Sequence, residues 1–208
     1  MEWKAYERNY WRYYLQLENV FLHLIEYVEF DAANFSVYSV KIMQLLLSIG
    51  SEVDAVLKEI CKIKDKNRPN MGDYAPIILT LYPNITKQSV YVFKRTLKLF
   101  PFDSWDLYNP SKSLQFWNVY NEVKHHRTEQ FSKATLGAVA NGLAALFVLN
   151  IYKLHDLFEE SNDVFQSMPE DESKLFYLEN WTEGIRTSQV KHPYRLIDYD
   201  DNSVIFQP

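Results

Sequence analysis

The residues best suited to chemistry lie in one short stretch of the chain, from Tyr120 to Arg127. Asn121 and His125 are four residues apart, so in a helix they lie one turn apart and can hold one ligand between them. Lys124 belongs to the same helical stripe. Cations offset the charge of a phosphate, and an imidazole can move a proton near neutral pH. We therefore predict Asn121, Lys124, His125 and Arg127 as catalytic residues that act on a phosphate group.

A second set of residues is predicted to contact the substrate or its phosphate. Trp117, Tyr120 and His126 flank the catalytic set along the chain. Glu52 lies at the edge of the apolar face of another predicted helix, where a carboxylate can turn toward a cavity or toward water. The simpler interpretation of the whole cluster is a helix end enriched in cations, which the helix dipole favours. The sequence leaves both interpretations open.

No metal and no cofactor are expected at this cluster. The two adjacent histidines are flanked by a lysine and an arginine, whose charges oppose a divalent cation. Glu122 and His125 form a single Glu-x-x-His pair, whereas a di-iron bundle needs two such pairs. The sequence contains no CxxC, HExxH or GxSxG motif and no glycine-rich phosphate loop, and Cys61 is its single cysteine. Nucleophilic catalysis therefore has no specific support.

The elements that position these residues are predicted from apolar periodicity. The last of four predicted helices is apolar nearly all round, so we expect it to be the central helix of a bundle. Its residues Ala138, Gly142 and Ala145 are small enough to let another helix approach closely. Ser111 and Ser132 are predicted as helix N-caps. The predicted helices span residues 3–28, 38–64, 111–128 and 134–154.

Residues 66–110 are predicted to form an irregular insertion in the bundle, because they contain five prolines. Within it, residues 89–93 and 96–100 are rich in β-branched and aromatic side chains and predict a small hairpin. We expect a helical-bundle domain over residues 1–160. Residues 161–208 are expected to form an acidic loop around Pro169 and a C-terminal appendage packed on the bundle. Residues 195–199 and 204–206 predict a second small hairpin there.

The composition also favours a mainly α fold, a bundle of four to five long helices with small β-hairpins. The chain has 5 glycines among 208 residues, whereas the average usage of about 7% would give roughly 15. The net charge of −5 is unlike that of proteins that coat nucleic acid through overall basicity. The N-terminal residues do not form a signal sequence, and no stretch of about 18 apolar residues is uninterrupted. We expect a soluble cytoplasmic protein that does not enter a membrane.

The stretch from Trp117 to Arg127, followed by the Ala-rich helix, resembles the HEPN superfamily of small helical-bundle proteins. The likeness runs from the 38–64 helix to about residue 153, a little over half of the chain. HEPN motifs have the form Arg-polar-x-x-x-His. Asn121 and His125 match the polar and His positions, whereas Tyr120 stands at the Arg position.

This resemblance implies a metal-independent RNA endonuclease of a toxin–antitoxin or phage-defence type, with a site assembled at a two-fold dimer interface. A ribose 2′-hydroxyl would attack the adjacent phosphate, His125 would handle protons, and Lys124 or Arg127 would supply the charge of the missing Arg. The partners implied are a second copy of the chain, RNA or a nucleotide, and an antitoxin-like protein. The alternative is a non-catalytic helical module that binds a nucleotide or a protein and dimerises through its aromatic-rich helices. The missing Arg, the negative net charge and the 5 Trp, 15 Tyr and 13 Phe residues favour this alternative.

Overall fold

The structure of the chain is a computed structural model that describes residues 2–64, 66–161, 171–178, 181–182 and 195–196. It is mainly α, with small antiparallel strand pairs, as the sequence predicts. The helical elements are α1 (Trp3–Tyr6), the π-helix η1 (Glu7–Trp11), α2 (Arg12–Leu24), the 3₁₀ turn η2 (Ala32–Asn34), α3 (Val40–Cys61), α4 (Met71–Leu81), the 3₁₀ turn η3 (Ile85–Lys87), α5 (Pro110–Ser113), α6 (Gln115–His125), α7 (Arg127–Gln130), the 3₁₀ turn η4 (Phe131–Lys133) and α8 (Leu136–Ser161). The strands are β1 (Val90–Val92), β2 (Lys98–Leu99), β3 (Phe176–Tyr177), β4 (Trp181–Thr182) and β5 (Arg195–Leu196).

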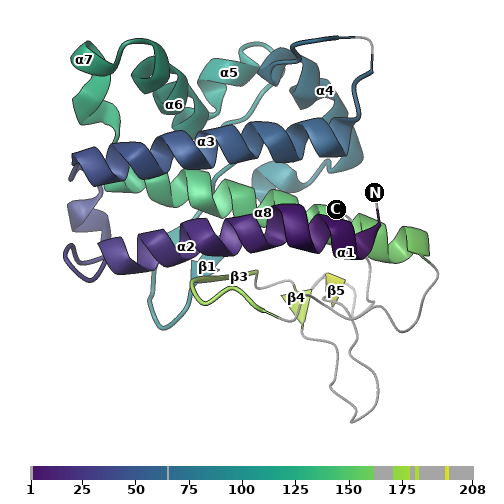
Figure 1. The fold of residues 1–208 in the computed structure, drawn as a ribbon, viewed down its shortest axis with the longest axis horizontal. Coiled ribbons are helices and arrows are strands. Elements are labelled where there is room, and N and C mark those ends of the chain that lie inside the picture. The colour runs from purple at the N-terminus through teal and green to yellow at the C-terminus, as the bar shows by residue number, and fades with distance from the viewer. Residues whose placement is uncertain (1, 65, 162–170, 179–180, 183–194, 197–208) are drawn as a thin grey trace.

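Three long helical segments make the core of the bundle. The elements α1, η1 and α2 follow one another without a break and lie alongside α3 and α8 (Figure 1). Helices α4 to α7 lie on one side of this layer, and β1 and β3 lie on the other (Figure 1). Gly142 of α8 confirms the predicted close approach, since a Cβ there would lie 3.2 Å from Ile49 Cγ2 of α3 and 3.3 Å from Phe116 Cδ2 of α6.

Helix α8 is the central helix that the sequence predicts. Its stretch from Leu136 to Leu157 is long and apolar enough to cross a membrane by length and composition, with a mean hydropathy of 1.4. In the structure, however, 83% of this apolar part of α8 is buried inside the protein. This burial is that of a core helix and agrees with a soluble protein, because an apolar surface packed against other helices is not available to lipid.

A three-stranded antiparallel sheet confirms the hairpin predicted in the middle of the chain. β1 pairs with β2 and, on its other edge, with β3, which comes from much later in the sequence. Lys94, in the turn after β1, has a φ of 58°, so a lysine fills the left-handed position that glycine usually occupies. The pairing with β3 joins the segment after α8 to the bundle, which a local sequence pattern does not reveal.

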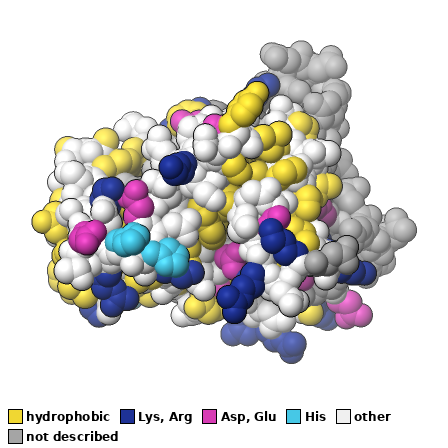
Figure 2. Space-filling model, turned by 90° about the horizontal axis from the view of Figure 1, so that it is seen from above, with side chains coloured by type: hydrophobic (Ala, Val, Ile, Leu, Met, Phe, Trp, Pro, Cys, Tyr) yellow, Lys and Arg dark blue, Asp and Glu magenta, His cyan; other side chains and the backbone are white. Residues whose placement is uncertain are grey.

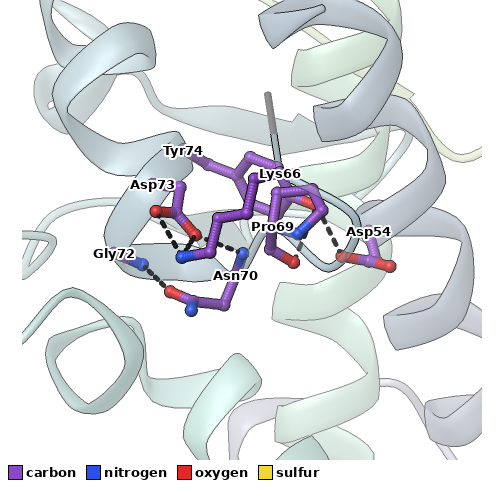
Figure 3. Close-up of polar contacts among 7 residues, drawn as sticks. All are labelled: Asp54, Lys66, Pro69, Asn70, Gly72, Asp73 and Tyr74. Atoms are coloured by element: carbon purple, nitrogen blue, oxygen red, sulfur yellow. Dashed lines mark hydrogen bonds and ion pairs between the residues drawn. The ribbon is translucent and has the colours of Figure 1, made fainter. Parts of the chain in front are cut away.

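Helix α4 corrects the prediction that residues 66–110 are irregular throughout. Its N-terminus is a capping box: Asn70 Oδ1 accepts from Gly72 N at 2.9 Å, and Asp73 Oδ2 accepts from Asn70 N at 2.8 Å (Figure 3). Lys66 Nζ donates to both oxygens of Asp73, and Tyr74 Oη donates to Asp54 of α3 (Figure 3). The first three contacts stabilise the start of α4, and the Tyr74–Asp54 hydrogen bond joins it to α3, although Pro76 lies inside the helix.

Several predicted helix boundaries also move. The 111–128 helix is divided into α5, α6 and α7, and α5 begins at Pro110 after Asn109 rather than at a Ser111 cap. Thr135, not Ser132, caps α8, because its Oγ1 accepts from Ala138 N at 3.3 Å. In the appendage, β5 pairs with β4. Residues 204–206 of the predicted second hairpin and the predicted acidic loop around Pro169 lie outside the described residues.

Candidate functional site

Helix α6 carries the predicted site, and its first half is anchored in the core. Its four buried residues contact the bundle and are Phe116, Trp117, Tyr120 and Val123. Tyr120 packs directly on α3, since a Cβ built on Gly50 would overlap the carbons of the Tyr120 ring. The absence of a side chain at Gly50 is therefore what allows α6 to lie this close to α3.

The polar residues at the end of α6 stand on open surface. The helix ends at His125, the chain leaves helical geometry at His126 (φ −132°, ψ 48°), and α7 starts at Arg127. Lys124, His125, His126 and Arg127 are all exposed. Figure 2 shows His side chains at the surface among Lys, Arg, Asp and Glu side chains. We call the segment formed by Lys124, His125, His126 and Arg127 the α6–α7 surface.

Few contacts restrain the α6–α7 surface. Lys124 Nζ lies 3.2 Å from Tyr120 Oη and 5.2 Å from the centroid of the Tyr120 ring. Within the described part of the chain, no ion pair joins Lys124 or Arg127 to a carboxylate. The nearby carboxylate of Glu122 is instead paired with Lys133 at 2.8 Å, and this hydrogen bond lowers the pKa of Glu122. No carboxylate of the described residues therefore competes with an anionic ligand for Lys124 or Arg127.

Asn121 keeps the predicted spacing to His125 on α6 and is partly buried. Among the described residues, no hydrogen bond joins the two side chains. Trp117 and Tyr120, predicted to contact substrate, are 6% and 5% exposed, and their ring centroids lie 5.0 Å apart. Both are core residues and are not exposed beside the α6–α7 surface, so the prediction that they contact a substrate stays a prediction.

Glu52 is not brought to this site. It is two residues from Gly50, so it points to nearly the opposite side of α3 from the Tyr120 contact. Its Oε1 is buried and has no hydrogen-bond partner among the described residues, and burial raises the pKa of the carboxyl from 4.5 to about 7. Burial, followed by negative charges that include Glu52, raises the pKa values of Tyr6 and Tyr10. Glu52 therefore belongs to the contact between α3 and the first helical segment.

Two features escaped the sequence reasoning. Glu18 of α2 is 1% exposed and accepts hydrogen bonds from Tyr14 Oη at 2.7 Å, Lys174 N at 2.9 Å and Leu175 N at 3.3 Å. It thereby fastens the segment before β3 to α2, although no local motif marks it. The second feature is a cavity of about 300 Å³ at the first turn of α6, the opposite end from the α6–α7 surface.

The described residues contain no group of three or more His, Cys, Asp or Glu side chains placed to hold a metal ion. A scan against known protein families finds no match, and searches of curated proteins and of solved structures find no significant match. The likeness to HEPN proteins therefore stays a prediction from the residues of α6. The site has to be interpreted from its own geometry.

Proposed function

We propose that this protein is a non-catalytic helical module that binds the phosphate groups of RNA or of a nucleotide through the α6–α7 surface. The observation that carries the proposal is the exposure of Lys124, His125, His126 and Arg127 side by side, with neither Lys124 nor Arg127 ion-paired among the described residues. Positive side chains that no carboxylate neutralises suit an anionic ligand. They form a local basic patch on a chain whose net charge is −5.

Binding without cleavage follows from the residues that α6 lacks. The position that the HEPN resemblance assigns to Arg is occupied by Tyr120, which is buried against Gly50. Arg127, the nearest guanidinium in sequence, lies beyond the helix break at His126. Attack by a ribose 2′-hydroxyl needs a held phosphate and aligned proton donors and acceptors. The imidazole of His125 stands instead on exposed surface without a hydrogen bond to Asn121.

The test measures binding and cleavage in the same samples. Fluorescence anisotropy with a labelled single-stranded RNA of about ten nucleotides would give the affinity of the full chain, and a denaturing gel would show whether the RNA is intact without added metal. We expect binding that weakens about tenfold or more in the Lys124→Ala/Arg127→Ala variant, with intact RNA in both samples. Lys4→Ala/Arg8→Ala, two exposed cations on the first helical segment, is the matched control.

Two results would overturn this proposal. If the wild type cleaves the RNA and the His125→Ala variant does not, the protein is the ribonuclease that the resemblance implies. Equal loss of affinity in the Lys4→Ala/Arg8→Ala control would mean that net charge, and not the α6–α7 surface, governs binding.

A further inference from the structure

The cavity at the first turn of α6 has the dimensions and lining of a small-ligand site. Its volume of about 300 Å³ is at the lower end of the range for ligand pockets. It lies between α6, the first turn of α8 and the segment after β2. The lining combines aromatic or small apolar residues, among them Phe100, Phe116 and Ala138, with a few polar ones, among them Asp103, Gln115 and Asn141.

The apolar part of the cavity suits a flat ring. Phe116 is 2% exposed and fixed in the core, whereas Phe100 is 43% exposed at the surface. Gly137 keeps another wall thin, since a Cβ there would lie 3.1 Å from Phe35 Cβ. Flat heteroaromatic rings stack on exposed aromatic side chains such as Phe100.

The polar part of the cavity offers mainly hydrogen-bond acceptors. Asn141 Nδ2 donates to Gly137 O at 3.0 Å, so its Oδ1 is left to accept from a ligand. The Asp103 carboxylate is an acceptor only, and the Gln115 amide can accept or donate. This set matches a ring whose edge presents N–H donors, such as an exocyclic amino group.

A cation lies beside the aromatic wall. Lys98 Nζ is 5.2 Å from the centroid of Phe100 and 4.7 Å from that of Tyr91. None of the ion pairs among the described residues includes Lys98. An ammonium group next to the ring that borders the cavity is suited to a phosphate attached to the ligand.

We propose that this cavity binds the base of a nucleotide that carries an exocyclic amino group, namely adenine, guanine or cytosine, with the phosphate directed to Lys98. The ligand class rests on the proposed function, but the site is a different one. The α6–α7 surface binds phosphate without regard to the base, whereas the cavity discriminates between bases. Gln115, Val119 and Glu122 follow one face of α6 at helical spacing and lead toward its C-terminal end, so a short strand of a few nucleotides can reach from the cavity to the α6–α7 surface.

The experiment is calorimetric titration of the full chain with AMP, GMP, CMP and UMP. Because uracil has no exocyclic amino group, we expect UMP to bind about tenfold more weakly than the best of the other three, the usual effect of one lost hydrogen bond. Asp103→Asn should remove most of this difference, because the new amide can also donate. Ala138→Leu should abolish binding by filling the cavity. Glu26→Gln, an exposed carboxylate that does not line the cavity, is the matched control.

The outcomes separate this proposal from the proposed function. The cavity site would be overturned by equal affinity for all four nucleotides or by no binding of any of them. It would also be overturned if folded Ala138→Leu and Asp103→Asn variants bind the nucleotides as the wild type does. None of these results would contradict phosphate binding by the α6–α7 surface. A different result would uphold the cavity site and overturn the proposed function. In that case the protein still discriminates between the nucleotides, but Lys124→Ala/Arg127→Ala binds RNA as well as the wild type does.

Discussion

The α6–α7 surface and the buried contacts of the first helical segment with α3 and α8 place polar side chains in opposite environments. On the surface, Lys124 and Arg127 are exposed and unpaired by carboxylates among the described residues. In the interior, Tyr6 Oη donates to Asn150 Oδ1 at 3.1 Å, while one carboxylate oxygen of the nearby Glu52 is buried with no hydrogen-bond partner in the described part of the chain. Charge at the surface is hydrated at little cost, whereas charge in the interior is penalised. We therefore expect surface changes to alter binding and interior changes to alter stability.

The largest effect on stability is expected where α6 meets α3. Gly50→Ala should lower the free energy of unfolding by about 2 kcal/mol, because the new methyl group overlaps the ring of Tyr120 and forces the helices apart. Urea denaturation measures this loss. In a Tyr120→Ala background the clash is absent, so Gly50→Ala should be neutral or stabilising by up to about 1 kcal/mol. The same loss in both backgrounds would contradict the proposed contact.

The next effect concerns the buried hydrogen bond between Tyr6 and Asn150, both of which are 0% exposed. Tyr6→Phe keeps the ring but leaves Asn150 Oδ1 without its donor, and should lower the free energy of unfolding by about 1–2 kcal/mol. Thermal and urea denaturation check this value. Tyr13→Phe on the exposed side of α2 is the control and should cost almost nothing; equal losses in the two variants would argue against the buried bond.

Glu52 should make stability depend on pH. Its carboxyl has a pKa of about 7 in the folded protein and 4.5 as the reference value, so the folded state holds the extra proton between these values. The free energy of unfolding should therefore fall as the pH rises from 4.5 to 7. Glu52→Gln should stabilise the protein by about 1–2 kcal/mol at pH 8, a figure reduced for partial solvent access, and hardly at all at pH 4.5. A stability gain that is the same at both pH values would show that Glu52 does not titrate in this range.

The smallest stability effect is expected on the α6–α7 surface. Lys124→Ala/Arg127→Ala should change the free energy of unfolding by less than about 0.5 kcal/mol while it weakens RNA binding. Urea denaturation and anisotropy on the same samples give both values. A loss of 1 kcal/mol or more with unchanged binding would support the simpler interpretation, in which the cations only stabilise the end of the helix.

Local patterns in the sequence predicted those features of the fold and of the candidate site that lie within a single helix or hairpin. Apolar periodicity predicted α3, an apolar stretch without a polar face predicted α8, and short segments rich in β-branched and aromatic residues predicted the pairing of β1 with β2. The end of α6 was predicted as a polar cluster because its residues are adjacent in the chain. Helix α4 was not predicted because Pro69 and Pro76 indicated an irregular segment. The sequence does contain the capping box at Asn70 and Asp73 that begins this helix.

Contacts between distant segments could not be predicted in the same way. Glu52 was grouped with α6, but the direction of its side chain is set by how α3 packs against the first helical segment. The burial of Tyr120 depends on Gly50, which is 70 residues away in the chain. The cavity at the first turn of α6 likewise needs residues from the β2 segment and from α8. One sequence carries no local signal for such contacts.

The central claim, that the α6–α7 surface binds phosphate, is tested most directly by the salt dependence of RNA affinity. The wild type should bind a labelled single-stranded RNA with an affinity that falls steeply with salt, because each neutralised phosphate releases counterions. Removing two cations with Lys124→Ala/Arg127→Ala should reduce the slope of log affinity against log salt by about 1.4, from the value of about 0.7 per contact. An unchanged slope in this variant, or no RNA binding by the wild type at low salt, would contradict the account.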